Sequence, residues 1–277
     1  MKRRLTFEQR EGVAPLPRQL QLKEISQEMR AVLWSSVYES MKRNVSNYWF
    51  YGGWEIVLRK RHVLLEHRPA DEFDPTAATL VHELKEIFMH GSYAKVFGLL
   101  EWILQQQETP PDLWLKIEEA LEYSHAAYRL IDGDMIVPIG SEQEIETLRH
   151  ALADTDHDPF VGARTHLKNA AKLLSEGQAA QSIRESVTAV EAVARVLDET
   201  ATTLAPALKA LAKVGTLHPA LQSGFEKLYG FASDEQGIRH ALLDSDKAKV
   251  DESDALYMLG ACAAFVSYLI RKAGNLR

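Results

Sequence analysis

The chain has 277 residues, which is more than one small domain needs and enough for two. Hydrophobic residues make up 46% of the sequence and charged residues 26%, a composition that excludes a disordered chain and is typical of a globular protein. The single cysteine, Cys262, excludes an internal disulfide, so nothing in the composition argues for secretion.

The net charge of −7 is unevenly distributed. Residues 1–68 contain 13 Lys and Arg against 7 Asp and Glu, so a basic first part precedes an acidic body. A basic end favours a polyanionic partner or a charge match within the molecule. A helix surface that happens to be basic is the simpler interpretation.

Two stretches of the sequence bear on where in the cell the protein is found. The first residues, 1–8, are basic but lack an apolar core, so they do not predict a signal peptide. The longest apolar stretch, residues 255–270, is short and contains Ser267, which favours a buried helix over a membrane span. We therefore expect a cytoplasmic protein without membrane contact.

The first half of the chain reads as helical after an arm. Residues 1–20 should be extended, because Gly12, Pro15 and Pro17 break a helix. Apolar residues at three- and four-residue spacing then predict a series of helices. These helices cover residues 23–42, 54–66 (helical or mixed), 76–90, 93–107 and 111–125.

Three local signals punctuate this half. Asp74 is expected to cap the helix that follows, with Pro75 at its first position. Asp132-Gly133 separates two short β-favouring runs and predicts the only clear hairpin, over residues 128–139. Ser141, with Glu144 three residues later, predicts a capping box at the start of another helix.

The second half is expected to be helical throughout, with short connections, as in an up-and-down bundle. Its helices cover residues 160–176, 178–199, 204–214, 219–229 and 253–272, and Gly177 marks the end of the first of them. The fold class is therefore mainly α, with two helical lobes, the first carrying a small β-hairpin. We expect the domains to be residues 1–155 and 156–277.

The acidic turn from Asp154 to Pro159 is the predicted boundary. Its carboxylates and His157 form a candidate metal site, but the spacing matches no known metal loop. A solvated turn that caps the next helix is the favoured interpretation, so we expect no metal.

A basic cluster lies in the segment 54–66. Arg59, Lys60 and Arg61 are followed by His62, and aromatic residues lie nearby. Such a cluster is compatible with nucleic-acid contact. A solvated helix face is the favoured alternative, because a few basic residues are not a specific signal.

The catalytic motifs that the sequence lacks exclude several classes of enzyme. It has no Gly-rich phosphate loop, no Cys-x-x-Cys, no His-Glu-x-x-His and no Gly-x-Ser-x-Gly. Nucleotide-dependent chemistry, zinc catalysis and serine hydrolysis are therefore unsupported, and we expect no cofactor.

One stretch, residues 229–246, does combine groups with catalytic potential. Arg239 and His240 follow Gly237, with Asp234 and Asp244 close in sequence. Arg is a permanent cation, whereas His gains or loses a proton near neutral pH. Together they are candidates for holding a phosphate and transferring a proton to or from an RNA 2′-hydroxyl or leaving oxygen, without a metal.

A structural role for Arg239 is the alternative. The long helix 178–199 carries Arg184 and Glu191, which are seven residues apart and so lie near one face. With Asp234 and Asp244, they are the residues expected to bind substrate or support the pair. If Glu191 points inward it needs a partner, and Arg239 is the natural one. A buried bridge between them would then anchor the loop.

A short internal similarity involves the same motif. Leu148-Arg-His-Ala-Leu resembles Ile238-Arg-His-Ala-Leu, and an Asp-x-Asp follows each. The match is short and the flanking residues differ, so we interpret it as coincidence.

Two sets of short motifs, one in each half of the chain, carry a resemblance to known families. The first half contains Phe7-Glu-Gln-Arg-Glu-Gly12, Leu33-Trp34, Leu99-Leu-Glu-Trp102 and Tyr128-Arg-Leu-Ile-Asp-Gly-Asp-Met-Ile-Val-Pro-Ile139. The second half contains Ser186-Val-Thr-Ala-Val-Glu191, Leu217-His-Pro-Ala220, Leu228-Tyr-Gly-Phe231, Asp234 and Gly237-Ile-Arg-His-Ala241. With these motifs the first lobe resembles an AbiJ-type amino-terminal domain, and the second half resembles the helical HEPN-like domain often fused to it.

The resemblance implies a role in abortive infection against phage, acting through RNA. Many HEPN-like domains are metal-independent endoribonucleases that work as homodimers, which would make Arg239 the phosphate clamp and His240 the acid or base. The usual signature is Arg, four to six residues, then His, whereas His240 directly follows Arg239 here. The alternative is a non-catalytic dimerising sensor or scaffold whose first lobe binds a phage or host ligand.

Overall fold

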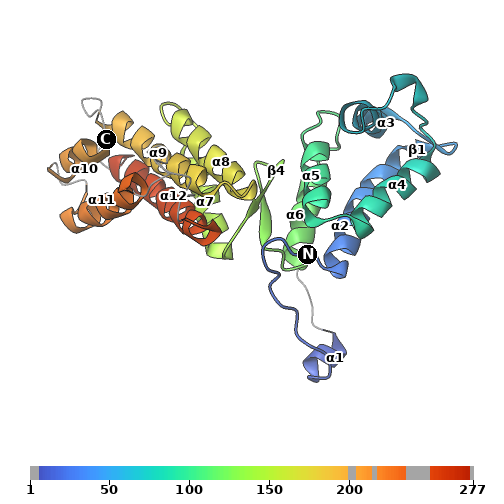
Figure 1. The fold of residues 1–277 in the computed structure, drawn as a ribbon, viewed down its shortest axis with the longest axis horizontal. Helices are drawn as coiled ribbons and strands as arrows, with labels where there is room; N and C mark the ends of the chain where they lie inside the picture. The colour runs from blue at the N-terminus through green and yellow to red at the C-terminus, as the bar shows by residue number, and fades with distance from the viewer. Residues whose placement is uncertain (1–5, 199–203, 214–216, 235–249, 275–277) are drawn as a thin grey trace, which may run out of the picture. The chain divides into compact units, whose positions relative to one another are not determined.

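The computed structural model is mainly helical, as predicted (Figure 1). It describes residues 6–198, 204–213, 217–234 and 250–274. Contacts divide the chain into two compact units, Met1–Ile136 and Val137–Arg277. The predicted boundary after residue 155 lies further along the chain and stays a prediction.

The first unit is built from short and medium helices. They are α1 (Phe7–Arg10), α2 (Gln27–Met41), α3 (Gly52–Lys60), α4 (Ala77–His90), α5 (Tyr93–Leu104) and α6 (Leu113–Tyr123), with 3-10 turns at Lys42–Asn44 and Ala70–Glu72 and a π-helical turn at Arg61–Leu65. The predicted helices are therefore present, although their ends differ.

The prediction that residues 1–20 are extended is wrong for α1. Residues Phe7–Arg10 form one helical turn because Thr6 and Gln9 make a capping box, with the Thr6 hydroxyl accepting from Gln9 N and the Gln9 amide oxygen accepting from Thr6 N. Similarly, α2 begins at Gln27 and not at residue 23, because the Ser26 hydroxyl caps it by accepting from Met29 N.

The predicted cap of α4 is wrong in its position. Thr76 is the residue before the helix, and the Asp74 carboxylate accepts hydrogen bonds from the backbone N and the hydroxyl of Thr76. Asp74 therefore orders the turn before α4 without capping the helix itself.

Helix α2 organises the core of the first unit. It packs against α4 and α6 through fully buried side chains at helical spacing. These side chains are Met29, Leu33, Val37 and Met41. The same core holds Trp54 of α3, whose indole N–H donates to the buried Ser40 hydroxyl at 3.1 Å, so this polar group is not left unpaired.

The predicted hairpin is confirmed. Strands β3 (Tyr128–Ile131) and β4 (Met135–Pro138) pair, and the connecting residues Asp132 and Gly133 have φ values of 53° and 83°. Asp134 N donates to Ile131 O at 3.3 Å, which closes the tight turn. Positive φ at both central residues is what a type I′ turn requires, and Asp-Gly supplies it at little energetic cost.

A second hairpin was not predicted. Residues 44–53 were expected to be a connection, but β1 (Val45–Ser46) pairs antiparallel with β2 (Trp49–Phe50). The turn residues Asn47 and Tyr48 have φ values of 48° and 70°. Tyr is rarely found in this region of backbone conformation, so the turn has no clear sequence signal.

The second unit is a helical bundle. Its helices are α7 (Glu142–Asp154), α8 (Val161–Ser175), α9 (Ala179–Leu197), α10 (Leu204–Lys213), α11 (Pro219–Asp234) and α12 (Glu252–Gly274). Helix α9 packs against α8, α10, α11 and α12, and α12 also packs against α7 and α8 (Figure 1). The buried residues of α9 include Ile183, Val187 and Val190, as its periodicity predicts.

The ends of these helices follow the predicted signals in part. Gly177, with φ 73°, ends α8, and Gln178 N donates to Leu173 O at 2.8 Å. Ser141 caps α7 by accepting from Glu144 N, but the Glu144 carboxylate accepts from Gly140 N and not from Ser141 N. The capping box is therefore displaced by one residue on its acidic side.

By length and composition, one helix among the described residues is apolar and long enough to cross a membrane, namely α12 over Glu252–Ala273. Its buried residues, which include Ala255, Cys262 and Val266, pack against neighbouring helices of the second unit. This packing agrees with the predicted buried helix, and the expectation of no membrane contact stays a prediction.

Candidate functional site

The predicted catalytic pair cannot be placed. Arg239, His240 and the supporting Asp244 lie outside the described residues. Asp234 is the last residue of α11, so this helix leads directly into the segment that carries the pair.

Glu191 of α9 is a buried polar group that contacts α11. It is only 7% exposed, and its Oε1 accepts a hydrogen bond of 3.0 Å from the Tyr229 hydroxyl. The carboxylate thus points inward, as the interpretation of Glu191 as a structural anchor requires. The donor belongs to Tyr229 of α11, a contact that the sequence did not predict, so Glu191 joins α9 to the helix that precedes Arg239 in the chain.

Arg184 is not brought to the same environment. It is exposed, although it lies seven residues before Glu191 and so at nearly the same angle around α9. The two residues are separated by about 10 Å along the helix axis. Tyr229 packs on α9 at Glu191. The residues that pack against each part of α9 therefore decide whether a side chain is buried, and helical spacing alone does not.

The basic cluster of the first unit is engaged in internal ion pairs. Arg59 lies 3.2 Å from Glu55 and stacks 4.7 Å from the centre of the Phe73 ring. Lys60 lies 2.7 Å from Glu108. This contact holds the pKa of the Glu108 carboxyl below its ordinary value. Nucleic-acid contact through these cations stays a prediction, and it would compete with their carboxylate partners.

Arg61 differs from its two neighbours because it is buried. It is 5% exposed and forms ion pairs with Glu66 and Glu83. It begins a π-helical turn, in which Glu66 N donates to Arg61 O at 3.1 Å. The sequence analysis favoured a solvated helix face for the whole basic cluster. Because Arg61 is buried, that interpretation is wrong for this residue.

This turn borders a cleft of about 810 Å³ within the first unit. Its lining combines the Arg61, Glu66 and Glu83 network with apolar side chains of α4 and α5, including Ile87 and Leu99. Pockets of this size with a few fixed polar groups commonly take small organic ligands. Turns of π-helix also recur at functional sites. Sequence reasoning missed the cleft because its residues come from separated helices.

No group of three or more potential metal ligands occurs among the described residues. In the acidic turn, Asp154 lies 3.1 Å from Arg271 and Asp156 lies 3.4 Å from Arg164. These carboxylates are therefore neutralised by arginines of the same unit.

Comparison with known families decides the relationship of this chain. The model of the family described as AbiJ N-terminal domain 4 matches residues 5–154. The chain belongs to this family. The AbiJ-type region contains the basic cluster, the π-helical turn, the cleft and the β3–β4 hairpin. Comparisons with curated proteins and with solved structures gave no significant match.

Proposed function

We propose that this protein acts in abortive infection against phage, with its second unit working as a HEPN-like homodimer that engages RNA. The observation that carries the proposal is membership of the AbiJ N-terminal domain 4 family. The resemblance of residues 156–277 to HEPN-like domains supports the RNA part. Helix α11, which leads into the Arg239-His240 segment, is joined to α9 through Tyr229 and Glu191.

The proposed reaction is RNA cleavage without a metal. Arg239 holds the scissile phosphate, and His240 accepts the proton of the adjacent 2′-hydroxyl. The 2′-oxygen forms a bond to phosphorus, the bond to the 5′-oxygen breaks, and that oxygen takes up a proton. The products are a 2′,3′-cyclic phosphate and a 5′-hydroxyl end. Because His240 adjoins Arg239 in the sequence, the usual geometry requires either a turn of the backbone between them or a contribution from the second subunit of the homodimer.

The test is incubation of the full chain with total bacterial RNA in EDTA. Wild type, Arg239→Ala and His240→Ala are compared, and the oligomeric state of each is measured by light scattering. Cleavage by wild type alone supports the proposal. Equal cleavage by all three proteins, or no cleavage by a folded wild-type dimer taken from phage-infected cells, contradicts the ribonuclease part.

A second function is favoured by the cleft of the first unit. Its volume and its buried Arg61 network suit a small phage or host ligand, which would make the protein a sensor. Gly98 lines the cleft and has open space where a side chain would project. Gly98→Leu should fill the cleft without a clash. Loss of phage protection in this variant, with protection kept in His240→Ala, would favour sensing over RNA cleavage.

A further inference from the structure

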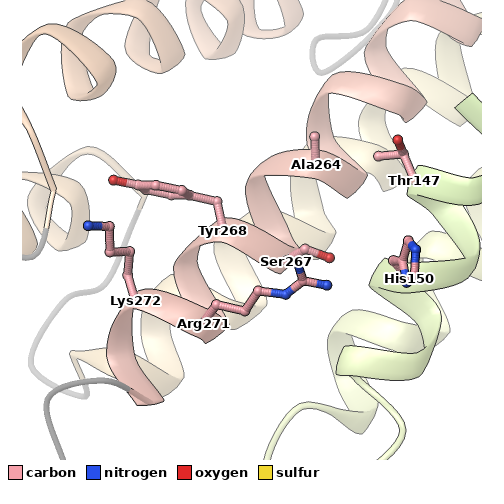
Figure 2. A pocket seen from close by; sticks show the side chains of 7 residues that line it. All are labelled: Thr147, His150, Ala264, Ser267, Tyr268, Arg271 and Lys272. Atoms are coloured by element: carbon pink, nitrogen blue, oxygen red, sulfur yellow. The ribbon is translucent and has the colours of Figure 1, made fainter. Parts of the chain in front are cut away.

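Helices α7 and α12 line an open pocket of about 380 Å³ on the second unit (Figure 2). Its polar lining includes Thr147 and His150 from α7 and Ser267 and Arg271 from α12. The volume lies in the range that accepts a small organic molecule. Nothing in the proposed RNA cleavage uses these residues, so the pocket poses a separate question.

Ser267 provides the first observation. The residue is 8% exposed, and its hydroxyl has no hydrogen-bond partner within the described parts of the chain. Serines inside helices usually donate to the carbonyl four residues earlier, as Ser186 does to Ser182 O at 2.8 Å. A buried hydroxyl left unpaired is unfavourable. A group in the pocket that accepted the proton of the Ser267 hydroxyl would remove this cost.

Arg271 provides the second observation. Its Nε and Nη2 contact Asp154 Oδ2 at 3.2 and 3.1 Å. Among the described residues these contacts leave Nη1 of the guanidinium available to donate to a ligand. Arg271 and Ser267 are four residues apart and so share a face of α12. Figure 2 shows both side chains on the side of α12 that faces His150.

The remaining groups define the chemistry of the ligand. The Thr147 hydroxyl donates to Gln143 O at 2.7 Å, so it has no proton to offer the pocket. On the side of α12 that faces α7, the donors are the Ser267 hydroxyl, the Arg271 guanidinium and a ring N–H of His150, and Arg271 is a permanent cation. A set made of donors and positive charge matches the oxygen atoms of a phosphate group.

Lys272 and Tyr268 also line the pocket, further around α12. Figure 2 shows the Lys272 side chain extending to the other side of α12, beside Tyr268, and its ammonium lies 5.8 Å from the centre of the Tyr268 ring. Lys272 therefore serves as a comparison for Arg271, because both are exposed cations on the last turn of the same helix.

We infer that the α7–α12 pocket binds a phosphate group through Arg271, Ser267 and His150. A nucleotide monophosphate and a phosphodiester of RNA both present such a group. His150 belongs to the first of the two Arg-His-Ala-Leu segments, and Asp154 begins the Asp-x-Asp that follows it.

Asp154 gives the inference its sharpest consequence. Its carboxylate occupies one edge of Arg271 and repels an anion in the pocket. Asp154→Asn should therefore tighten phosphate binding. If Arg271 only neutralised Asp154 and the C-terminal end of α7, neither wild type nor Asp154→Asn would bind phosphate.

The experiment measures thermal stabilisation of the full chain by inorganic phosphate, against sodium chloride at equal ionic strength. Wild type should be stabilised, Asp154→Asn should respond at lower phosphate concentration, and Arg271→Ala should raise the apparent Kd about tenfold or more. Ser267→Ala should weaken binding without removing a charge. Lys272→Ala should have a smaller effect than Arg271→Ala, and Lys172→Ala, an equally exposed cation on α8, should have none.

Two further probes distinguish the source of the phosphate. Adenosine 5′-monophosphate is compared with adenosine, and a short oligoribonucleotide with a 5′-hydroxyl is tested beside them. Stabilisation by the monophosphate alone assigns a monoester, and stabilisation by the oligoribonucleotide assigns the RNA backbone. The inference is overturned if wild type shows no response to phosphate, or if Arg271→Ala and Ser267→Ala both respond as wild type does. Neither result depends on RNA cleavage, so the two proposals fail separately.

Discussion

The Tyr229 hydroxyl donates to the buried Glu191 carboxylate at 3.0 Å and thereby joins α11 to α9. The contact matters because α11 ends at Asp234, just before the segment with Arg239 and His240. A carboxylate in this position needs hydrogen bonds to compensate for its loss of water. The Tyr229–Glu191 contact is therefore expected to set the position of α11.

Removing this hydrogen bond should destabilise the protein. Tyr229→Phe keeps the ring and deletes the donor, and it should lower the free energy of unfolding by about 1–3 kcal/mol because Glu191 loses a partner. Urea denaturation followed by circular dichroism measures the change. Glu191→Gln is the matched control, since it keeps an acceptor for Tyr229. A midpoint unchanged by Tyr229→Phe would show that the contact carries no stability.

Arg61 and Arg59 should behave differently although they are two residues apart. Arg61→Ala leaves Glu66 and Glu83 without their buried cation, so we expect a loss of about 3 kcal/mol or more in unfolding free energy. Arg59→Ala removes an exposed cation and should change stability by less than about 1 kcal/mol. Parallel urea denaturation curves of the two variants test this difference, and similar midpoints would contradict the structural role of Arg61.

Asp112 should contribute to stability in a pH-dependent way. Lys116 Nζ lies 2.7 Å from its carboxylate, and this contact, with a smaller effect of Arg43, holds the pKa of Asp112 below its ordinary value. A carboxyl whose folded-state pKa is lowered stabilises the protein above its unfolded-state pKa, and that stability is lost as the pH falls through the folded-state pKa.

The matched variant is Asp112→Asn. At neutral pH it should be less stable than wild type by under about 1 kcal/mol, because solvent screens this half-exposed pair. The difference should disappear in acid once Asp112 of the wild type is protonated. Thermal unfolding between neutral and acidic pH measures both proteins, and a difference that stays constant with pH would refute the assignment.

Cys262 should be unreactive in the folded protein. It is fully buried in α12, and this burial raises the pKa of its thiol above the ordinary value. Thiol reagents attack the thiolate, which is both rare and inaccessible here. Labelling with a coloured disulfide reagent at pH 8 should therefore be slow in buffer and fast in urea. Rapid labelling of the native protein would mean that α12 opens readily from its neighbours.

Local chemistry made the helices and one hairpin predictable. The apolar spacing of Met29, Leu33 and Val37 needs only the helical period, and Asp132-Gly133 needs only its backbone preference. The β1–β2 hairpin could not be predicted in this way, because Tyr48 adopts a backbone conformation that its residue type disfavours. Tertiary contacts around β1 and β2 override that preference.

The sequence by itself determined the helical fold, the β3–β4 turn and the AbiJ-type relationship, because each depends on short-range pattern. Only the tertiary structure decided that Arg61 is buried, that Glu191 meets Tyr229, and that Ser267 and Arg271 face α7 in a shared pocket. These facts join residues tens to more than a hundred positions apart. Periodicity shows which side of a helix is apolar, but the helix that covers it decides which polar groups are buried, paired or left for a ligand.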